Sequence, residues 1–139
     1  LISSPTSSFI EFIKLSSMCS LFTLFTHHAK TTRALVLSLR NSLLKEGSFS
    51  NEQVATQQVV NVVNFDVHLH LDREGRRYVE RVTQIRERPD LSAGYELIDL
   101  VVYENGSYRQ LHRLDDTTRR QMERWMSETE RKEFRLAEV

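Results

Sequence analysis

The chain has 139 residues, with 19 basic and 19 acidic side chains and a single cysteine. This length fits one compact domain, and zero formal net charge excludes a strong overall attraction to nucleic acid or to an anionic membrane. One cysteine excludes an internal disulfide framework and favours a reducing compartment. In residues 1–26, Glu11 and Lys14 interrupt the apolar run before it reaches the roughly 20 residues that a membrane-spanning helix needs.

The first predicted elements are a short strand and two helices. Ser20–Phe25 is apolar and predicts a buried strand. In Thr32–Lys45, leucine and valine recur at helical spacing, and Gly47 is placed to end that helix. Residues 50–53 read Ser-Asn-Glu-Gln, a capping box with Ser50 as the cap, so a second helix should run to about Val60.

Two hairpins are predicted next. Residues 63–71 alternate apolar and polar side chains, which predicts a strand with one buried face. A tight turn at residues 72–75 leads to a returning strand over Arg77–Arg86. Tyr95–Tyr103 predicts another strand, and Asn105-Gly106 predicts a type I′ turn before Tyr108–Leu111.

The last predicted element is a C-terminal helix. Asp115 or Asp116 can cap it, and it carries apolar side chains at helical spacing. These side chains are Met122, Trp125 and Met126, and they are expected to be core or subunit-interface anchors. Ser127 with Glu130 can cap a final short turn of helix.

Several segments carry a resemblance to a known family. Residues 25–32 (FTHHAKTT) with residues 37–44 (LSLRNSLL) resemble the His box and following helix of type II/type IV secretion-system ATPases. Residues 58–69 and 75–85, with the basic returning strand YVERVTQI, resemble the late hairpin of that family. Residues 95–108 (YELIDLVVYENGSY) are similar to the closing hairpin of the CpaF-like branch, which serves Tad pili and conjugation-type systems.

The resemblance covers residues 20–139 and leaves 1–19 unmatched. It implies an α/β fold, the C-terminal part of a RecA-like P-loop NTPase domain: one strand and two helices, then two β-hairpins and a C-terminal helix. It also implies a cytoplasmic homo-hexamer, peripheral to the inner membrane, that binds ATP and Mg²⁺ between subunits. Its partners would be other copies and the inner-membrane secretion machinery, with no direct contact to nucleic acid.

The chain departs from that family in its phosphate-binding motifs. It contains no G-x-x-x-x-G-K-[ST], and its four glycines stand more than ten residues apart. In the family, this loop and the acidic magnesium motif lie upstream of the His box. Because the chain starts with Leu and lacks both motifs, we expect a fragment that is not catalytically competent alone and binds no cofactor tightly. The alternative is a small α+β interaction or regulatory module without enzymatic activity.

The resemblance implies that His28, and less strongly His27, is the nucleotide-responsive histidine of the box. An imidazole can hydrogen-bond a phosphate or a metal-bound water. Thr26 and Arg40 are the accompanying nucleotide-binding or interface candidates. From the residues alone, a solvent-facing histidine pair at a strand–helix junction stays open.

Three further groups of side chains have simpler interpretations. The polar face of the first hairpin strand has metal-binding residue types, but alternation alone explains it; these residues are Asp66, His68, His70 and Asp72. A basic cluster on the returning strand is expected to be a solvated face, since Glu80 and Glu87 interrupt it; its members are Arg76, Arg77, Arg81, Arg86 and Arg88. Cys19 is expected to be an inert thiol.

Overall fold

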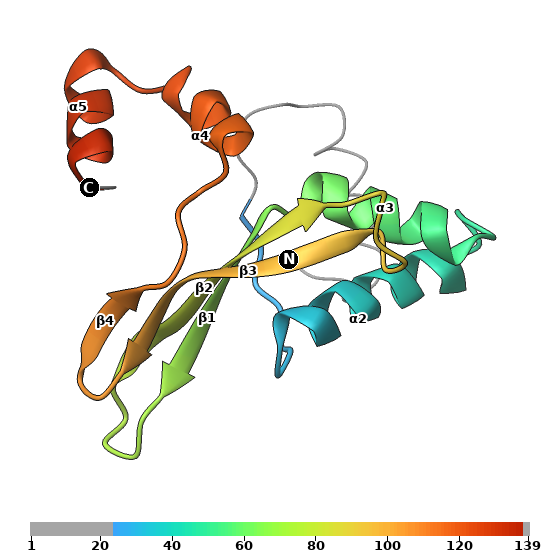
Figure 1. Ribbon diagram of the computed structural model, residues 1–139. Coiled ribbons are helices and arrows are strands. Elements are labelled where there is room, and N and C mark those ends of the chain that lie inside the picture. The colour runs from blue at the N-terminus through green and yellow to red at the C-terminus, as the bar shows by residue number, and fades with distance from the viewer. Residues whose placement is uncertain (1–23, 138–139) are drawn as a thin grey trace.

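The computed structural model describes residues 24–137. Within that range the protein is an α/β structure, with a helical hairpin, a four-stranded antiparallel sheet and a C-terminal pair of helices (Figure 1). The elements in chain order are α2 (Thr32–Lys45), α3 (Glu52–Val62), β1 (Phe65–Leu71), β2 (Arg77–Glu87), β3 (Tyr95–Glu104), β4 (Ser107–Gln110), α4 (Asp116–Glu123) and α5 (Glu128–Ala137).

Helix α2 has the predicted boundaries, and its apolar stripe forms the centre of the core. Leu35, Val36, Leu39 and Leu43 are all buried, as the helical spacing requires. Glu46 caps the C-terminus, and Gly47 follows with a φ of +73°, a conformation that glycine adopts at little cost. The helix prediction is confirmed.

Helix α3 begins one residue later than predicted. Asn51, not Ser50, is the N-cap, because the Asn51 side chain accepts hydrogen bonds from the backbone N–H groups of Gln53 and Val54. The helix extends to Val62 and buries Ala55, Val59 and Val60 against α2 and the sheet.

The four strands form a simple meander in the order β1-β2-β3-β4. Both predicted hairpins are confirmed, and pairing of β2 with β3 joins them into one sheet. Asn105 and Gly106 have φ angles of 52° and 82°, as a type I′ turn demands. The ladder shifts register between His68 and Leu69 on β1, and again between Val82 and Thr83 on β2.

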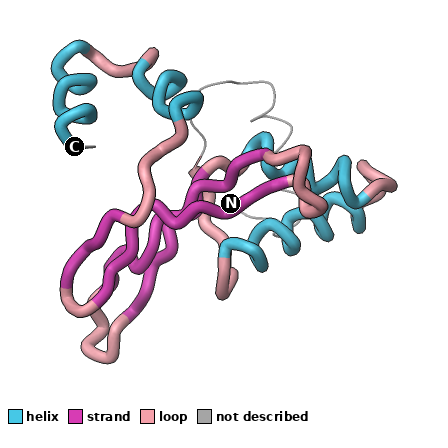
Figure 2. The backbone as a smooth tube through the Cα atoms, in the orientation of Figure 1, coloured by secondary structure: helices cyan, strands magenta, loops and turns pink. Residues whose placement is uncertain are grey.

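Helices α2 and α3 cover only one end of the sheet (Figures 1 and 2). There, Ile85 and Tyr95 are buried in the same cluster as the leucines of α2. The other end, which holds the β1–β2 and β3–β4 turns, extends beyond the helices. We call these two parts the covered half and the open half of the sheet.

Strand β1 does not have the predicted buried face. Val67, Leu69 and Leu71 are 53%, 62% and 57% exposed. Alternation did place these side chains on one face, but no described element covers that face in the open half. The prediction of a strand was therefore correct, and the prediction of its burial was wrong.

The predicted strand Ser20–Phe25 is not confirmed. Residues 20–23 lie outside the described range, and Leu24 and Phe25 have an irregular, non-strand conformation. Leu24 is 95% exposed, whereas Phe25 packs against the core.

The C-terminal segment forms two helices, where one helix and a final short helical turn were predicted. Asp115 caps α4 as predicted, but α4 ends at Glu123, before Trp125 and Met126. Ser127 and Glu130 form the predicted reciprocal capping box, and they start a helix of 10 residues rather than a single turn. Trp125 is 62% exposed, so it is not a core residue of the described chain.

Candidate functional site

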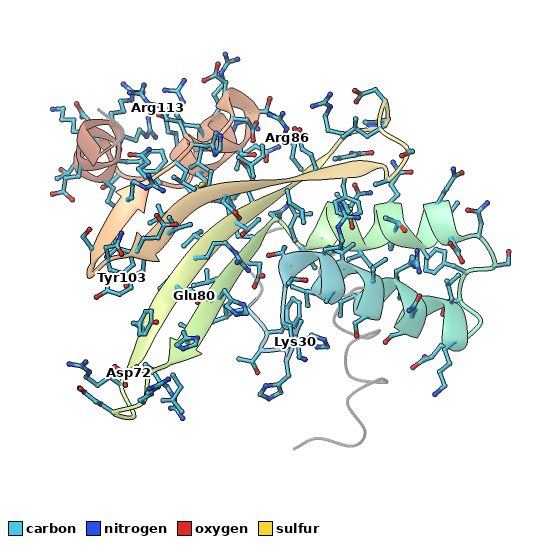
Figure 3. All side chains as sticks on the ribbon, turned by 60° about the horizontal axis from the view of Figure 1, so that its bottom comes forward. Lys30, Asp72, Glu80, Arg86, Tyr103 and Arg113 are labelled. Carbon is cyan, nitrogen blue, oxygen red and sulfur yellow. The ribbon has the colours of Figure 1, made fainter. Side chains whose placement is uncertain are left out.

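The His-box segment is an extended stretch that leads directly into α2. Thr26, His27 and His28 are all exposed, and Ala29 packs against the core. Figure 3 shows Lys30 at the end of this stretch, close to the first strands of the sheet. The box side chains are therefore available to a ligand or partner at the N-terminus of α2.

Hydrogen bonds fix the N-terminus of α2 to the sheet. The Thr31 hydroxyl oxygen accepts from the backbone N–H of Ala34 at 3.1 Å, which caps the helix. The hydroxyl of Thr32, which is buried, donates to Oδ2 of Asp66 at 2.7 Å. The start of α2 is thus anchored to the start of β1.

A shallow cavity of about 170 Å³ lies beside this junction. Its wall combines the first residues of α2 with side chains from β2 and β3. The lining residues are Thr31, Thr32, Arg33, Arg81, Thr83, Leu97 and Asp99.

The Arg81 side chain lines this cavity and is held in place by its neighbours. Its Nε lies 3.1 Å from the Thr83 hydroxyl and 3.6 Å from a carboxylate oxygen of Asp99. Thr83 is buried and donates to the same Asp99 oxygen at 2.6 Å. The start of a helix and two arginines, Arg81 and the exposed Arg33, suit an anionic group, while Asp99 partly offsets that charge.

Sequence reasoning missed this cavity. It identified Arg81 only as part of a basic run, and it assigned no role to Thr83 or Asp99. The alternation of β2 does place Arg81 and Thr83 on one face, but that signal does not reveal which helix end faces them.

Arg40 does not lie beside the His-box residues. It lies eight residues after Thr32, about 12 Å along the axis at 1.5 Å per residue. Its guanidinium hydrogen-bonds the side-chain oxygen of Asn41 at 2.9 Å and lies 3.5 Å from Glu52 of α3. The observed contacts of Arg40 therefore link the two helices of the hairpin.

The side chains on the polar face of β1 make contacts with separate partners. Two histidines flank one carboxylate: His68 Nε2 and His70 Nδ1 lie 3.6 and 3.7 Å from the two oxygens of Glu80. Asp66 is bound to Thr32, and Asp72 is bound to Arg76. Across residues 24–137, no group of three His, Cys, Asp or Glu side chains is placed to hold a metal ion.

Four arginines of the predicted basic cluster, Arg76, Arg81, Arg86 and Arg88, lie close to carboxylates. Arg86 and Arg88 share Glu96, and Arg88 also binds Asp90 at 2.6 Å. The Arg88 guanidinium lowers the pKa of Asp90 to about 2. Arg76 lies 2.9 Å from both Asp72 and Glu74. These ion pairs support the interpretation of this strand face as a solvated, charge-paired surface.

An aromatic row crosses the open half, and it was not predicted from the sequence. The rings of His70, Tyr78, Tyr103 and Tyr108 follow one another with centroid separations of 5.4, 4.9 and 5.0 Å. Burial beside its neighbours raises the pKa of the Tyr78 hydroxyl, with Glu80 and Asp72 adding to the effect. The row forms because cross-strand pairing sets His70 against Tyr78 and Tyr103 against Tyr108.

Comparisons with protein-family models, with curated proteins and with solved structures find no match. Within the described part of the chain, none of the helices is both long and apolar enough to cross a lipid bilayer.

Proposed function

We propose that the chain is the C-terminal part of a CpaF-like secretion ATPase, a RecA-like hexameric motor that uses ATP and Mg²⁺ for pilus assembly, protein export or conjugative transfer. In the complete protein it shapes the subunit interface and couples the nucleotide state to movement. It works in the cytoplasm, against the inner-membrane secretion machinery. This proposal rests on the sequence resemblance.

One structural observation supports the proposal most directly. The box of residues 26–29 passes without interruption into the capped N-terminus of α2, and that helix end is bound to β1 of the arginine-bearing hairpin. A histidine in the box can therefore hydrogen-bond a phosphate, and a movement of the box would be passed through α2 to the sheet. His28 is the sensing residue in this proposal, and His27 and Thr26 accompany it.

The cavity beside α2 supports a role in contacting anionic groups. Arg33 and Arg81 provide charge, and the first N–H groups of α2 provide a favourable dipole. The chain lacks the glycine-rich loop that grips phosphates during hydrolysis. We therefore expect it to respond to nucleotide held by another part of the motor, and to release no phosphate from ATP by itself.

The test measures two properties of the purified chain. The first is phosphate release from ATP with Mg²⁺, for which we expect the rate of the buffer blank. The second is binding, by calorimetry, to the P-loop-bearing portion of a CpaF-like ATPase that ends before its His box. We expect a defined complex. Robust hydrolysis by the chain alone, or no complex, would refute the proposal.

The open half of the sheet favours one second candidate, a regulatory module that binds an intact secretion ATPase. An uncovered aromatic row and uncovered apolar side chains are typical of an interaction surface. Calorimetry with both the intact ATPase and the truncated one distinguishes the two proposals. A module binds the intact ATPase, whereas a missing C-terminal part binds only an ATPase that lacks its own.

A further inference from the structure

Strand β1 has one edge with which no strand of the described residues pairs, and it also carries exposed apolar side chains. It lies at one end of the strand order and pairs with β2 alone among the described strands. Val67, Leu69 and Leu71 are each more than half exposed on this strand. An apolar edge strand of this kind is a template for pairing with another strand.

The opposite edge of the sheet differs. Strand β4 has only four residues, Ser-Tyr-Arg-Gln, and Arg109 is engaged by Glu104 at 2.7 Å. A short, polar edge with a charged side chain resists strand addition. Of the two edges, β1 is therefore the one suited to pairing.

Two copies of β1 match each other side chain by side chain when they run antiparallel. β1 reads Phe-Asp-Val-His-Leu-His-Leu, and antiparallel pairing centred on His68 sets Phe65 opposite Leu71 and Val67 opposite Leu69. The same register sets Asp66 opposite His70, a carboxylate facing an imidazole. Every apolar side chain meets an apolar one, and all seven residues are used.

A slip of one residue would set apolar side chains opposite polar ones, so the register is specified by the pattern itself. A second copy of the chain carries this complementary strand, and isologous pairing places each contact twice about a twofold axis. We propose that two copies of this chain pair antiparallel through β1, with His68 opposite His68 of the second copy, and form one continuous eight-stranded sheet. This proposal does not depend on the proposed function.

The first test is the mass of the chain by sedimentation equilibrium. We expect a dimer for the unchanged chain and a monomer for Leu69→Lys. Leu69 is 62% exposed, so a lysine there is tolerated by the single copy but sets a charge in the pairing strand. The matched control is Val54→Lys near the start of α3. Val54 is 50% exposed and is not part of the pairing strand, so this variant should remain dimeric.

The second test fixes the register. In His68→Cys the two new thiols face each other across the twofold axis, at the separation of directly opposed antiparallel residues, which a disulfide can span. We expect a disulfide-linked dimer on mild oxidation, above the level given by Cys19 in the unchanged chain. Tyr108→Cys on β4 is the control and should add none. A monomeric unchanged chain, or a dimer that persists in Leu69→Lys without linkage in His68→Cys, would overturn the proposal.

Discussion

The covered and open halves of the sheet share the long strands β2 and β3 but differ in what holds them. In the covered half, Ile85 and Tyr95 are buried against the leucines of α2 and the valines of α3. In the open half, the backbone ladder joins the strands, ring contacts add to it, and apolar side chains of β1 stay exposed. The packed core therefore lies at one end of the strands, and the exposed apolar side chains of β1 lie at the other.

The largest effect should come from a matched pair of leucine truncations, one in each half. Leu39→Ala removes a side chain that is 2% exposed, and we expect it to lower the free energy of unfolding by about 2–5 kcal/mol. Leu69→Ala, at a position 62% exposed, should change it by less than about 1 kcal/mol. Urea unfolding at low protein concentration measures both. Equal losses would show that the open half is also packed.

A smaller effect is expected where α4 meets the sheet. The Asp115 side chain caps α4 by accepting from the N–H groups of Thr117 and Thr118, and it also binds the buried Gln84. Asp115→Ala should destabilise the protein by about 1 kcal/mol, as loss of an N-cap typically does. Asp115→Asn is the control, because an asparagine retains the capping oxygen. Thermal unfolding followed by circular dichroism compares the two.

The same carboxylate gives a pH dependence with a defined sign. Burial opposes ionisation of Asp115, but hydrogen bonds from Thr118, Gln84 and Thr117 outweigh it and hold its pKa below the usual 3.8. The stabilisation is therefore complete above the unfolded-state pKa and is lost as the pH falls through the lower folded-state value. We expect the unchanged chain to lose more stability than Asp115→Asn between about pH 6 and about pH 3. Parallel losses would contradict this.

The smallest change in stability should come from a substitution in the β1–β2 turn. Arg76 is 74% exposed, and its contacts with Asp72 and Glu74 are surface ion pairs. Arg76→Gln should change the free energy of unfolding by less than about 1 kcal/mol. Backbone N–H groups, above all that of Arg76 itself, keep the Asp72 turn formed and its pKa low. A large loss in urea unfolding would give these ion pairs a greater role than surface pairs have.

The local features of this fold could be predicted from the sequence, because each depends on residues close together. The apolar spacing in Thr32–Lys45 gave the boundaries of α2, and Asn105-Gly106 gave the second hairpin turn. The error at Ser50 arose because Asn51 is an equally good cap one residue later.

The features that were not predicted correctly depend on contacts between distant parts of the chain. Alternation in β1 showed that Val67 and Leu69 share a face, but it could not show that no element of residues 24–137 packs on that face. The cavity beside α2 required Arg81 and Asp99 to meet a helix end far away in sequence. Only the placement of the helical hairpin on one end of the sheet determines both results.

The most direct test of the proposed motor function is ATP hydrolysis in a reconstituted mixture. The P-loop-bearing portion of a CpaF-like ATPase, ending before its His box, is mixed with this chain and phosphate release is followed. We expect the unchanged chain to raise the rate well above that of the portion alone. A chain with His28→Ala should bind equally well but fail to raise it. If the unchanged chain binds without effect, or His28→Ala restores hydrolysis fully, the proposed coupling role of the box is wrong.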